Sequence, residues 1–130
     1  MTYLYLASPY SSPNPSIRDR RASEALAATA WLLRMKRWVY SPIVHCHELT
    51  FVHELPTDAK YWQDYNHALL ERSKGLLVLL AEGWEDSVGV AGEISYAKEL
   101  GLEVGGLRLR TNVFPVTYEF CSIPSGPKVP

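Results

Sequence analysis

Blocks of apolar and polar residues follow one another along the chain, and their periods predict an alternation of strands and helices. Residues 2–8 are dense in β-forming side chains, and the unbroken apolar run at 75–81 is typical of a strand buried on both faces of a parallel sheet. Apolar residues that recur with helical spacing predict helices over residues 16–36, 57–73 and 90–100.

Weaker segments complete the prediction. Residues 37–42 predict a short strand and residues 102–109 a fourth strand, whereas residues 43–56 predict a loop long enough to suggest a function. The succession predicts one α/β domain, flavodoxin-like or Rossmann-like: a three-layer sandwich with right-handed crossovers around a 4- or 5-stranded parallel sheet. This domain is expected to span residues 1–110, and residues 111–130 are expected to form an edge strand or an irregular tail.

The predicted topology places three loops at one edge of the sheet. Ligands of such sheets bind beyond the carboxyl ends of the strands. The loops at residues 8–15, 41–56 and 81–89 all follow predicted strands. We therefore expect a functional site to be built from these loops and from the starts of the helices that follow them.

Composition narrows the classes of partner and compartment. The chain has 130 residues and a net charge of −1, which argues against a nucleic acid polymer or an anionic membrane surface as partner. Cys46 and Cys121 show no metal-type spacing and predict free thiols in a reducing compartment. With no apolar run approaching about 18 residues and no signal-peptide pattern at the N-terminus, a cytoplasmic protein is expected.

The segment at residues 81–93 carries the first candidate chemistry. A strand, a loop of small residues and a helix start form the geometry of an anion site, to which Ser87 can add a hydroxyl and Gly89 a close backbone approach. Neither a dinucleotide fingerprint nor a phosphate-binding P-loop is present, so a small anion or a sugar phosphate is expected. The alternative is that Asp86 or Ser87 only caps the helix.

Three further residues could carry out catalysis. Glu93 lies near the expected first turn of the third helix, where the helix dipole favours a carboxylate; it is either a charge at the helix start or a nucleophile held ionised by that helix end. Asp64 is either solvated or the second carboxylate of a glycosyl-transfer pair. Tyr5 is either a core residue or the donor of its hydroxyl to a catalytic carboxylate.

Aromatic and histidine side chains offer candidates for binding a nucleobase. The histidines of residues 43–56 lack a second ligand pair at zinc spacing, so we expect no metal, and His45 or His47 is the better candidate to line a base pocket. Trp84 and Trp62 could stack on a base, and the alternative for each is partial burial in the core.

Several of these stretches together resemble a known group of enzymes. "YLYLASPYS", the helix that carries Asp64, the apolar strand and "GWEDSVGVAGEISYAKELG" are similar to the nucleoside 2-deoxyribosyltransferase-like superfamily, and most of all to its DUF1937 branch. The superfamily also includes 2′-deoxynucleoside 5′-monophosphate N-glycosidases. The resemblance covers roughly residues 2–107, and its most specific element joins Ser87, Gly89 and Glu93 to the Ile94 and Ala97 that follow.

The resemblance implies a role for each matching residue. Glu93 matches the nucleophile that attacks C1′ of a sugar, and Tyr5 matches the tyrosine that orients it. Asp64 matches the aspartate that contacts the sugar or protonates the leaving base. Ser87 matches the serine of the monophosphate hydrolases, where transferases have an aspartate, and this favours a 5′-monophosphate. Because the first loop lacks the phosphate-binding pattern of those hydrolases, Ser8, Ser11, Ser12 or Arg18 is expected to supply phosphate contacts instead.

These expectations combine into one functional hypothesis and its rivals. The first is cleavage or transfer at the N-glycosidic bond of a (deoxy)nucleoside or its 5′-monophosphate, through a glycosyl ester of Glu93 and without a cofactor. The rivals are a nucleotide-binding module of the same fold that has lost the chemistry, and an interaction protein that assembles through residues 41–56 and its tail. A homodimer is expected, because a small sheet tends to bury spare helix faces against a copy of itself.

Overall fold

The computed structural model describes residues 2–124 and contains a five-stranded sheet with strand order β2-β1-β3-β4-β5. The strands are β1 (Leu4–Ala7), β2 (Val39–Tyr40), β3 (Gly75–Leu79), β4 (Val104–Thr111) and β5 (Thr117–Cys121). The first four are parallel, which confirms the α/β fold, whereas β5 runs antiparallel to β4. The sheet is therefore mostly rather than entirely parallel.

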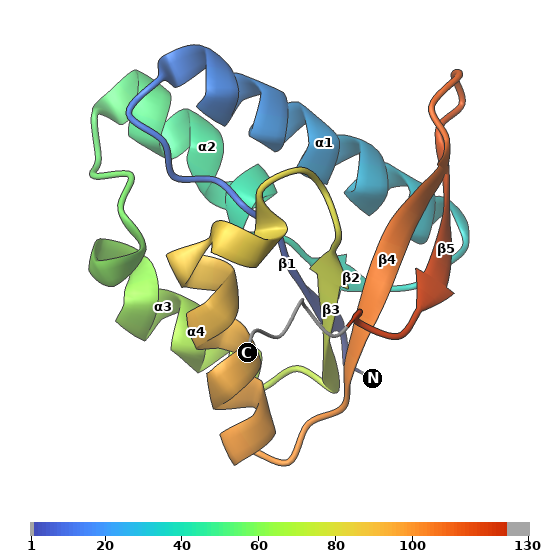
Figure 1. The fold of residues 1–130 in the computed structure, drawn as a ribbon. Coiled ribbons are helices and arrows are strands. Elements are labelled where there is room, and N and C mark those ends of the chain that lie inside the picture. Colours follow the sequence, from blue (N-terminus) through green and yellow to red (C-terminus); the bar gives the residue numbers. More distant parts are fainter. Residues whose placement is uncertain (1, 125–130) are drawn as a thin grey trace, which may run out of the picture.

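Four helices cover the two faces of this sheet (Figure 1). They are α1 (Pro15–Arg34), α2 (Pro42–His53), α3 (Ala59–Glu71) and α4 (Val88–Glu99). Helix α1 lies on one face and α3 and α4 lie together on the other, whereas α2 lies beside α1. Within residues 2–124, no helix has both the length and the apolar character needed to cross a membrane.

Alternation along the strands divides the core into two clusters. Toward α1, the buried residues are Leu6, Ala28, Leu32, Leu77, Leu79, Leu107 and Tyr118. Toward α3 and α4, they are Tyr5, Ala7, Leu70, Leu76, Val78, Val90 and Ala97. Because successive side chains of a strand point to opposite faces, the Leu6 side chain faces α1 while that of Tyr5 faces α4. This places the Tyr5 side chain on the α4 side of a central strand.

Helix α2 corrects the sequence-based prediction of a loop at residues 43–56. The sequence predicts that Ser41 and Pro42 end a strand, whereas in the structure they begin a helix. The Ser41 Oγ accepts a hydrogen bond of 3.1 Å from the backbone N–H of Val44. Proline suits the first helical position because its missing N–H would have had no partner there. The β-branched, aromatic and histidine residues that follow have low helix propensity, and packing against α1 outweighs that preference.

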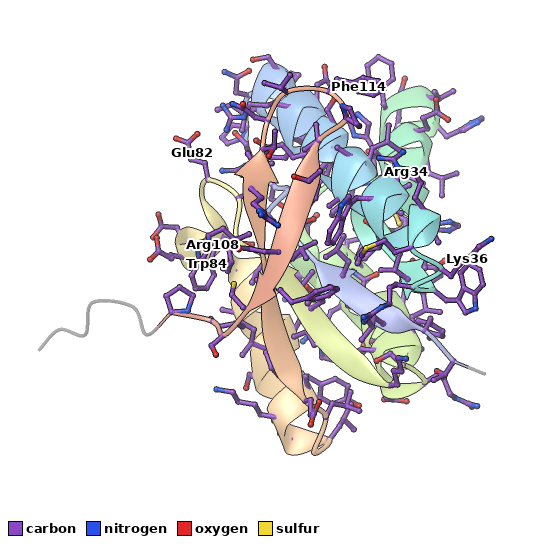
Figure 2. The ribbon with its side chains drawn as sticks, turned by 90° about the vertical axis from the view of Figure 1, so that its right-hand side faces the viewer. Arg34, Lys36, Glu82, Trp84, Arg108 and Phe114 are labelled. Carbon is purple, nitrogen blue, oxygen red and sulfur yellow. The ribbon has the colours of Figure 1, made fainter. Side chains whose placement is uncertain are left out.

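The segment after residue 110 forms one arm of a hairpin. Strand β5 pairs with β4 at the edge of the sheet, and Phe114 at the hairpin tip is 87% exposed (Figure 2). The remainder of the predicted tail, residues 125–130, lies outside the described part of the chain.

Candidate active site

A cleft lies beyond the carboxyl ends of β1, β2 and β3, and residues of the loop after β1, of α2 and of the starts of α3 and α4 line it. Its lining consists of Ser8, Tyr10, Ser11, Pro42, Ile43, Cys46, His47, Thr50, Thr57, Asp58, Ala59, Trp62, Asn66, Ser87, Gly89 and Glu93. The cleft and its open mouth together hold about 550 Å³ of space not filled by protein atoms, and part of that space is open solvent. This is the edge of the sheet at which the sequence predicted a site.

Glu93 lies in this cleft and is joined to the central strand by a hydrogen bond. The Tyr5 hydroxyl donates to Glu93 Oε2 at 2.5 Å, and both residues are buried. Burial raises the pKa of Glu93 to about 7, and the Tyr5 hydrogen bond acts in the opposite direction by stabilising the carboxylate. Burial, then the neighbouring Glu93 charge, raise the pKa of Tyr5, so its hydroxyl stays protonated and donates.

Helix α4 begins earlier than predicted, and this changes the electrostatic argument for Glu93. Ser87 is the N-cap and Val88 the first helical residue, so Glu93 lies in the second turn. The effect of a helix dipole on a charge falls off within the first turn. Burial and the Tyr5 hydroxyl therefore control the charge of Glu93, and the expectation that the helix end holds it ionised is corrected.

Serine hydroxyls of the cleft and backbone amides at the start of α4 offer donors to an anion. Ser87 Oγ accepts a hydrogen bond of 3.1 Å from the Val90 N–H, so it caps the helix and still has its own proton to donate. Ser8 is 7% exposed, and its Oγ has no hydrogen-bond partner among the described residues. A buried hydroxyl without a partner on a cleft wall is an available ligand contact. Ser11 is engaged differently, because its Oγ donates to the Thr57 carbonyl at 2.8 Å.

Helix α3 contributes Trp62 and Asn66 to the cleft rather than Asp64. Residues four apart share one face of a helix, and a residue midway between them points to the opposite side. Accordingly Asp64 is exposed and does not line the cleft, whereas Asn66 does, with a buried Oδ1 that has no partner within residues 2–124. The structure therefore does not bring Asp64 together with Glu93.

Helix α2 makes the same distinction between its two central histidines. His47 shares a face with Ile43 and Thr50 and lines the cleft with them. His45 is exposed, and its Nε2 lies 2.9 Å from the Tyr65 hydroxyl on the outer surface. Helical spacing would have singled out His47 if residues 42–53 had been predicted as a helix.

Trp84 lies away from the cleft. It is partly buried against the core cluster between the sheet and α4. It is not among the residues that line the cleft. Of the two tryptophans considered for stacking on a base, only Trp62 lines the cleft.

A second cleft opens between α3 and α4 and shares Glu93, Asn66 and Gly89 with the first. Gly89 lies in the first turn of α4, where an N–H group has no acceptor within the helix. Glu93 thus stands where two clefts meet, and both are open to a ligand or to water.

The cleft also contains a thiol. Cys46 lines it, and both Cys46 and Cys121 are free. Burial raises the pKa of Cys46 to about 11, which keeps it as a thiol at neutral pH and makes it a poor nucleophile. Across residues 2–124, no group of three His, Cys, Asp or Glu side chains is arranged to hold a metal ion. Glu93 is the cleft residue best suited to nucleophilic attack.

The hydrogen bond between Tyr5 and Glu93 yields a first testable prediction. Replacing Tyr5 by phenylalanine removes the donor that lowers the pKa of Glu93 while burial remains, so the pKa should rise above its value of about 7. Titration of the ¹³C-labelled Glu93 carboxyl by NMR measures this shift directly. Tyr61→Phe, on the exposed surface of α3, is the matched control. A Glu93 pKa that is equal or lower in Tyr5→Phe would contradict the assignment.

Comparison with protein-family models gives a match. A family model described as "Domain of unknown function (DUF1937)" matches residues 2–106, a span that runs from β1 into β4 and includes the whole lining of the cleft. No curated protein matches the chain.

Proposed function

Because the chain belongs to the DUF1937 family, described only as a domain of unknown function, we propose its activity from the cleft: cleavage or transfer at the N-glycosidic bond of a (deoxy)nucleoside or its 5′-monophosphate. The observation that carries the proposal is a buried carboxylate in an open cleft, hydrogen-bonded to a tyrosine of the central strand at 2.5 Å. The resemblance to the nucleoside 2-deoxyribosyltransferase-like superfamily supports the same reaction.

The reaction proceeds by double displacement. In the first step an ionised Glu93 oxygen attacks C1′, the C1′–N bond breaks, and the base leaves with the bonding electrons and takes a proton from an acid in the cleft. In the second step water, or a second base, attacks C1′, the ester bond to Glu93 breaks, and the proton lost by the attacking group returns to that acid. Two successive inversions at C1′ retain the configuration of the sugar, as in retaining glycosidases.

The environment of Glu93 suits a nucleophile that works near neutral pH. Its pKa of about 7 leaves a large ionised fraction at pH 7 to 8. Burial removes water that would otherwise solvate the carboxylate, and the Tyr5 hydroxyl keeps one oxygen oriented while the other faces the substrate. Tyr5 is thus a positioning residue for the nucleophile.

The donors around the start of α4 favour a phosphate on the substrate. The Ser8 hydroxyl is unpartnered among the described residues, the Ser87 hydroxyl keeps its proton, and the helix end supplies N–H groups. Among the described residues that line the first cleft there is no lysine or arginine, so within it neutral hydrogen bonds would hold this phosphate, whereas Lys60 lines the second cleft.

Incubation with a panel of ribo- and deoxyribonucleosides and their 5′-monophosphates tests the function, with released base measured by chromatography. We expect base release, faster from the monophosphates. Ser8→Ala should raise KM for the monophosphate by roughly 10-fold or more, the size of one hydrogen bond to a charged group, with little change for the nucleoside. Ser95→Ala, on the exposed face of α4, is the matched control.

Two outcomes would count against the proposal. If no member of the panel releases its base while nucleotide binding is still measurable by calorimetry, the nucleotide-binding module becomes the better description. If Ser8→Ala raises KM for nucleosides and for monophosphates by the same factor, Ser8 does not contact the phosphate.

A further inference from the structure

A chain of three polar side chains runs from the cleft to the surface. Tyr10 follows β1, His47 lies on α2 and Asp19 on α1, so three separate elements bring them together. The Tyr10 hydroxyl lies 2.8 Å from His47 Nδ1, and His47 Nε2 lies 3.2 Å from Asp19 Oδ1. Tyr10 and His47 line the cleft, and the Asp19 side chain is 63% exposed. The chain therefore connects the cleft with solvent.

Hydrogen-bond chemistry fixes the direction of these contacts. The Asp19 carboxylate can only accept, so His47 Nε2 carries a proton. In neutral His47 the other nitrogen, Nδ1, then accepts the Tyr10 proton. The Thr50 hydroxyl, 3.2 Å from Tyr10, donates to the His47 carbonyl at 2.8 Å and has no second proton to offer.

Protonation of His47 reverses the contact with Tyr10. When both ring nitrogens carry protons, Nδ1 donates to the Tyr10 oxygen. The Tyr10 proton is then released from His47 and can be donated to a ligand in the cleft. Histidine is the side chain that ordinarily changes protonation between pH 5 and 8. The three residues thus have two states, and in only one of them is Tyr10 a donor toward the cleft.

We propose that Tyr10 is the proton donor to the departing base and that His47, oriented by Asp19, recharges it; this inference rests on the proposed function. As the C1′–N bond breaks, the base nitrogen takes the Tyr10 proton, and Tyr10 takes the Nδ1 proton of His47. His47 becomes neutral and no net charge is left on the base. When water attacks C1′ in the second step, its proton returns through Tyr10 to His47 and Glu93 is freed. Tyr10 is the catalytic residue, and His47 and Asp19 act through it.

The other titratable groups of the cleft are less suited to this task. Glu93 is the nucleophile and leaves the reaction ionised. Asp58 caps α3, where its Oδ2 accepts a hydrogen bond of 3.1 Å from the Tyr61 N–H. Burial raises the pKa of Cys46 to about 11, and among the described residues no histidine is hydrogen-bonded to its thiol to return a proton, as His47 is to Tyr10. Asp64 lies outside the cleft lining. Tyr10, backed by His47, remains as the donor.

His47 can exchange protons without passing them through the substrate. It also lines a separate cavity between α1 and α2, on which Asp19 and Glu48 lie as well. These two carboxylates are the charged groups that face it there, and the Phe51 ring stacks on its imidazole. Solvent reaching this cavity can restore the His47 proton between turnovers.

A comparison of two leaving groups tests the relay. The first substrate is the nucleoside or nucleotide that the wild-type protein cleaves fastest, whose base must be protonated as it leaves. The second carries p-nitrophenol on the same sugar and departs as a stable anion without a proton. Tyr10→Phe should lower kcat on the first substrate by about 10²–10⁴-fold, the usual range of general acid catalysis. On the second, kcat should stay within a few-fold of the wild type.

His47→Gln gives an independent measurement if Tyr10→Phe folds poorly. With the first substrate, wild-type kcat/KM should fall at high pH as His47 loses its proton, and His47→Gln should abolish this limb. The nitrophenyl substrate should show no such limb in either protein. His53→Gln, at the exposed end of α2, and Tyr61→Phe are matched controls and should behave as the wild type.

The outcomes separate the relay from the reaction it serves. Equal losses on both substrates in Tyr10→Phe would assign Tyr10 to binding or structure and overturn the relay alone. A wild type that cleaves only the nitrophenyl substrate would overturn both the relay and the proposed cleavage of the N-glycosidic bond, because no base is then released. If the wild type cleaves neither substrate, the proposed function fails and the relay with it.

Discussion

Replacing Glu93 by alanine is expected to reduce base release by at least about 10⁴-fold, the order of loss when a nucleophile is removed from a covalent mechanism. Without the carboxylate no glycosyl ester can form, and Tyr5 loses the group it orients. Glu93→Gln should lose activity to the same extent, because a neutral amide oxygen cannot attack C1′. Released base measured by chromatography, with the wild type and both variants side by side, checks this.

Two further measurements make the Glu93 result specific. Glu99→Gln, at the exposed end of the same helix, should retain wild-type activity. Mass spectrometry of the wild-type protein quenched during turnover should find the mass of one sugar on the peptide that contains Glu93. Activity near the wild type in Glu93→Ala, or a sugar attached to another residue, would remove Glu93 as the nucleophile.

Glu93 should also make the protein less stable as the pH rises. Its pKa is about 7 in the folded protein against an ordinary value of 4.5, so between these values the folded state holds a proton that the unfolded state has lost. The contribution of Glu93 to the free energy of unfolding therefore falls across this window and is level on either side. At about 1.4 kcal/mol for each pH unit, the decrease amounts to about 3 kcal/mol. Urea unfolding at pH 4 and pH 8 measures it.

Glu93→Gln isolates this contribution from the other titrating groups. The difference in unfolding free energy between Glu93→Gln and the wild type should shift by about 3 kcal/mol in favour of the variant from pH 4 to pH 8. The same comparison for Glu99→Gln should show a much smaller change, because that side chain is exposed. A pH-independent difference for Glu93→Gln would mean that the carboxyl titrates alike in the folded and unfolded chain.

Both predictions depend on features that differ in how visible they are in the sequence. The fold was predictable because strands with β-forming or unbroken apolar residues alternate with helices of clear period. The loops of the site followed from topology, because parallel strands end at the same edge of a sheet. The structure then adds the contact between Tyr5 and Glu93, which joins residues 88 positions apart.

Helical phase explains most of what the sequence did not reveal. Asp64 attracts attention as a carboxylate, but the face of α3 that meets the cleft carries Trp62 and Asn66. A helix start displaced by two residues moved Glu93 from the first turn to the second. An error of one or two residues in a boundary is small for a fold and decisive for a side chain. The prediction of a loop at residues 43–56 was wrong for another reason. Their low helix propensity is outweighed by packing against α1, and the local sequence does not show that packing.

The position of Tyr5 on the central strand bears on how such a site can change over time. Tyr5 is held between neighbouring strands and is fully buried, whereas the cleft wall is made of the loop after β1, of α2 and of the starts of α3 and α4. Substitutions in that wall can alter which base or sugar fits without disturbing the carboxylate and its partner. Under the proposed function, the reaction and the choice of substrate therefore depend on separate parts of the fold.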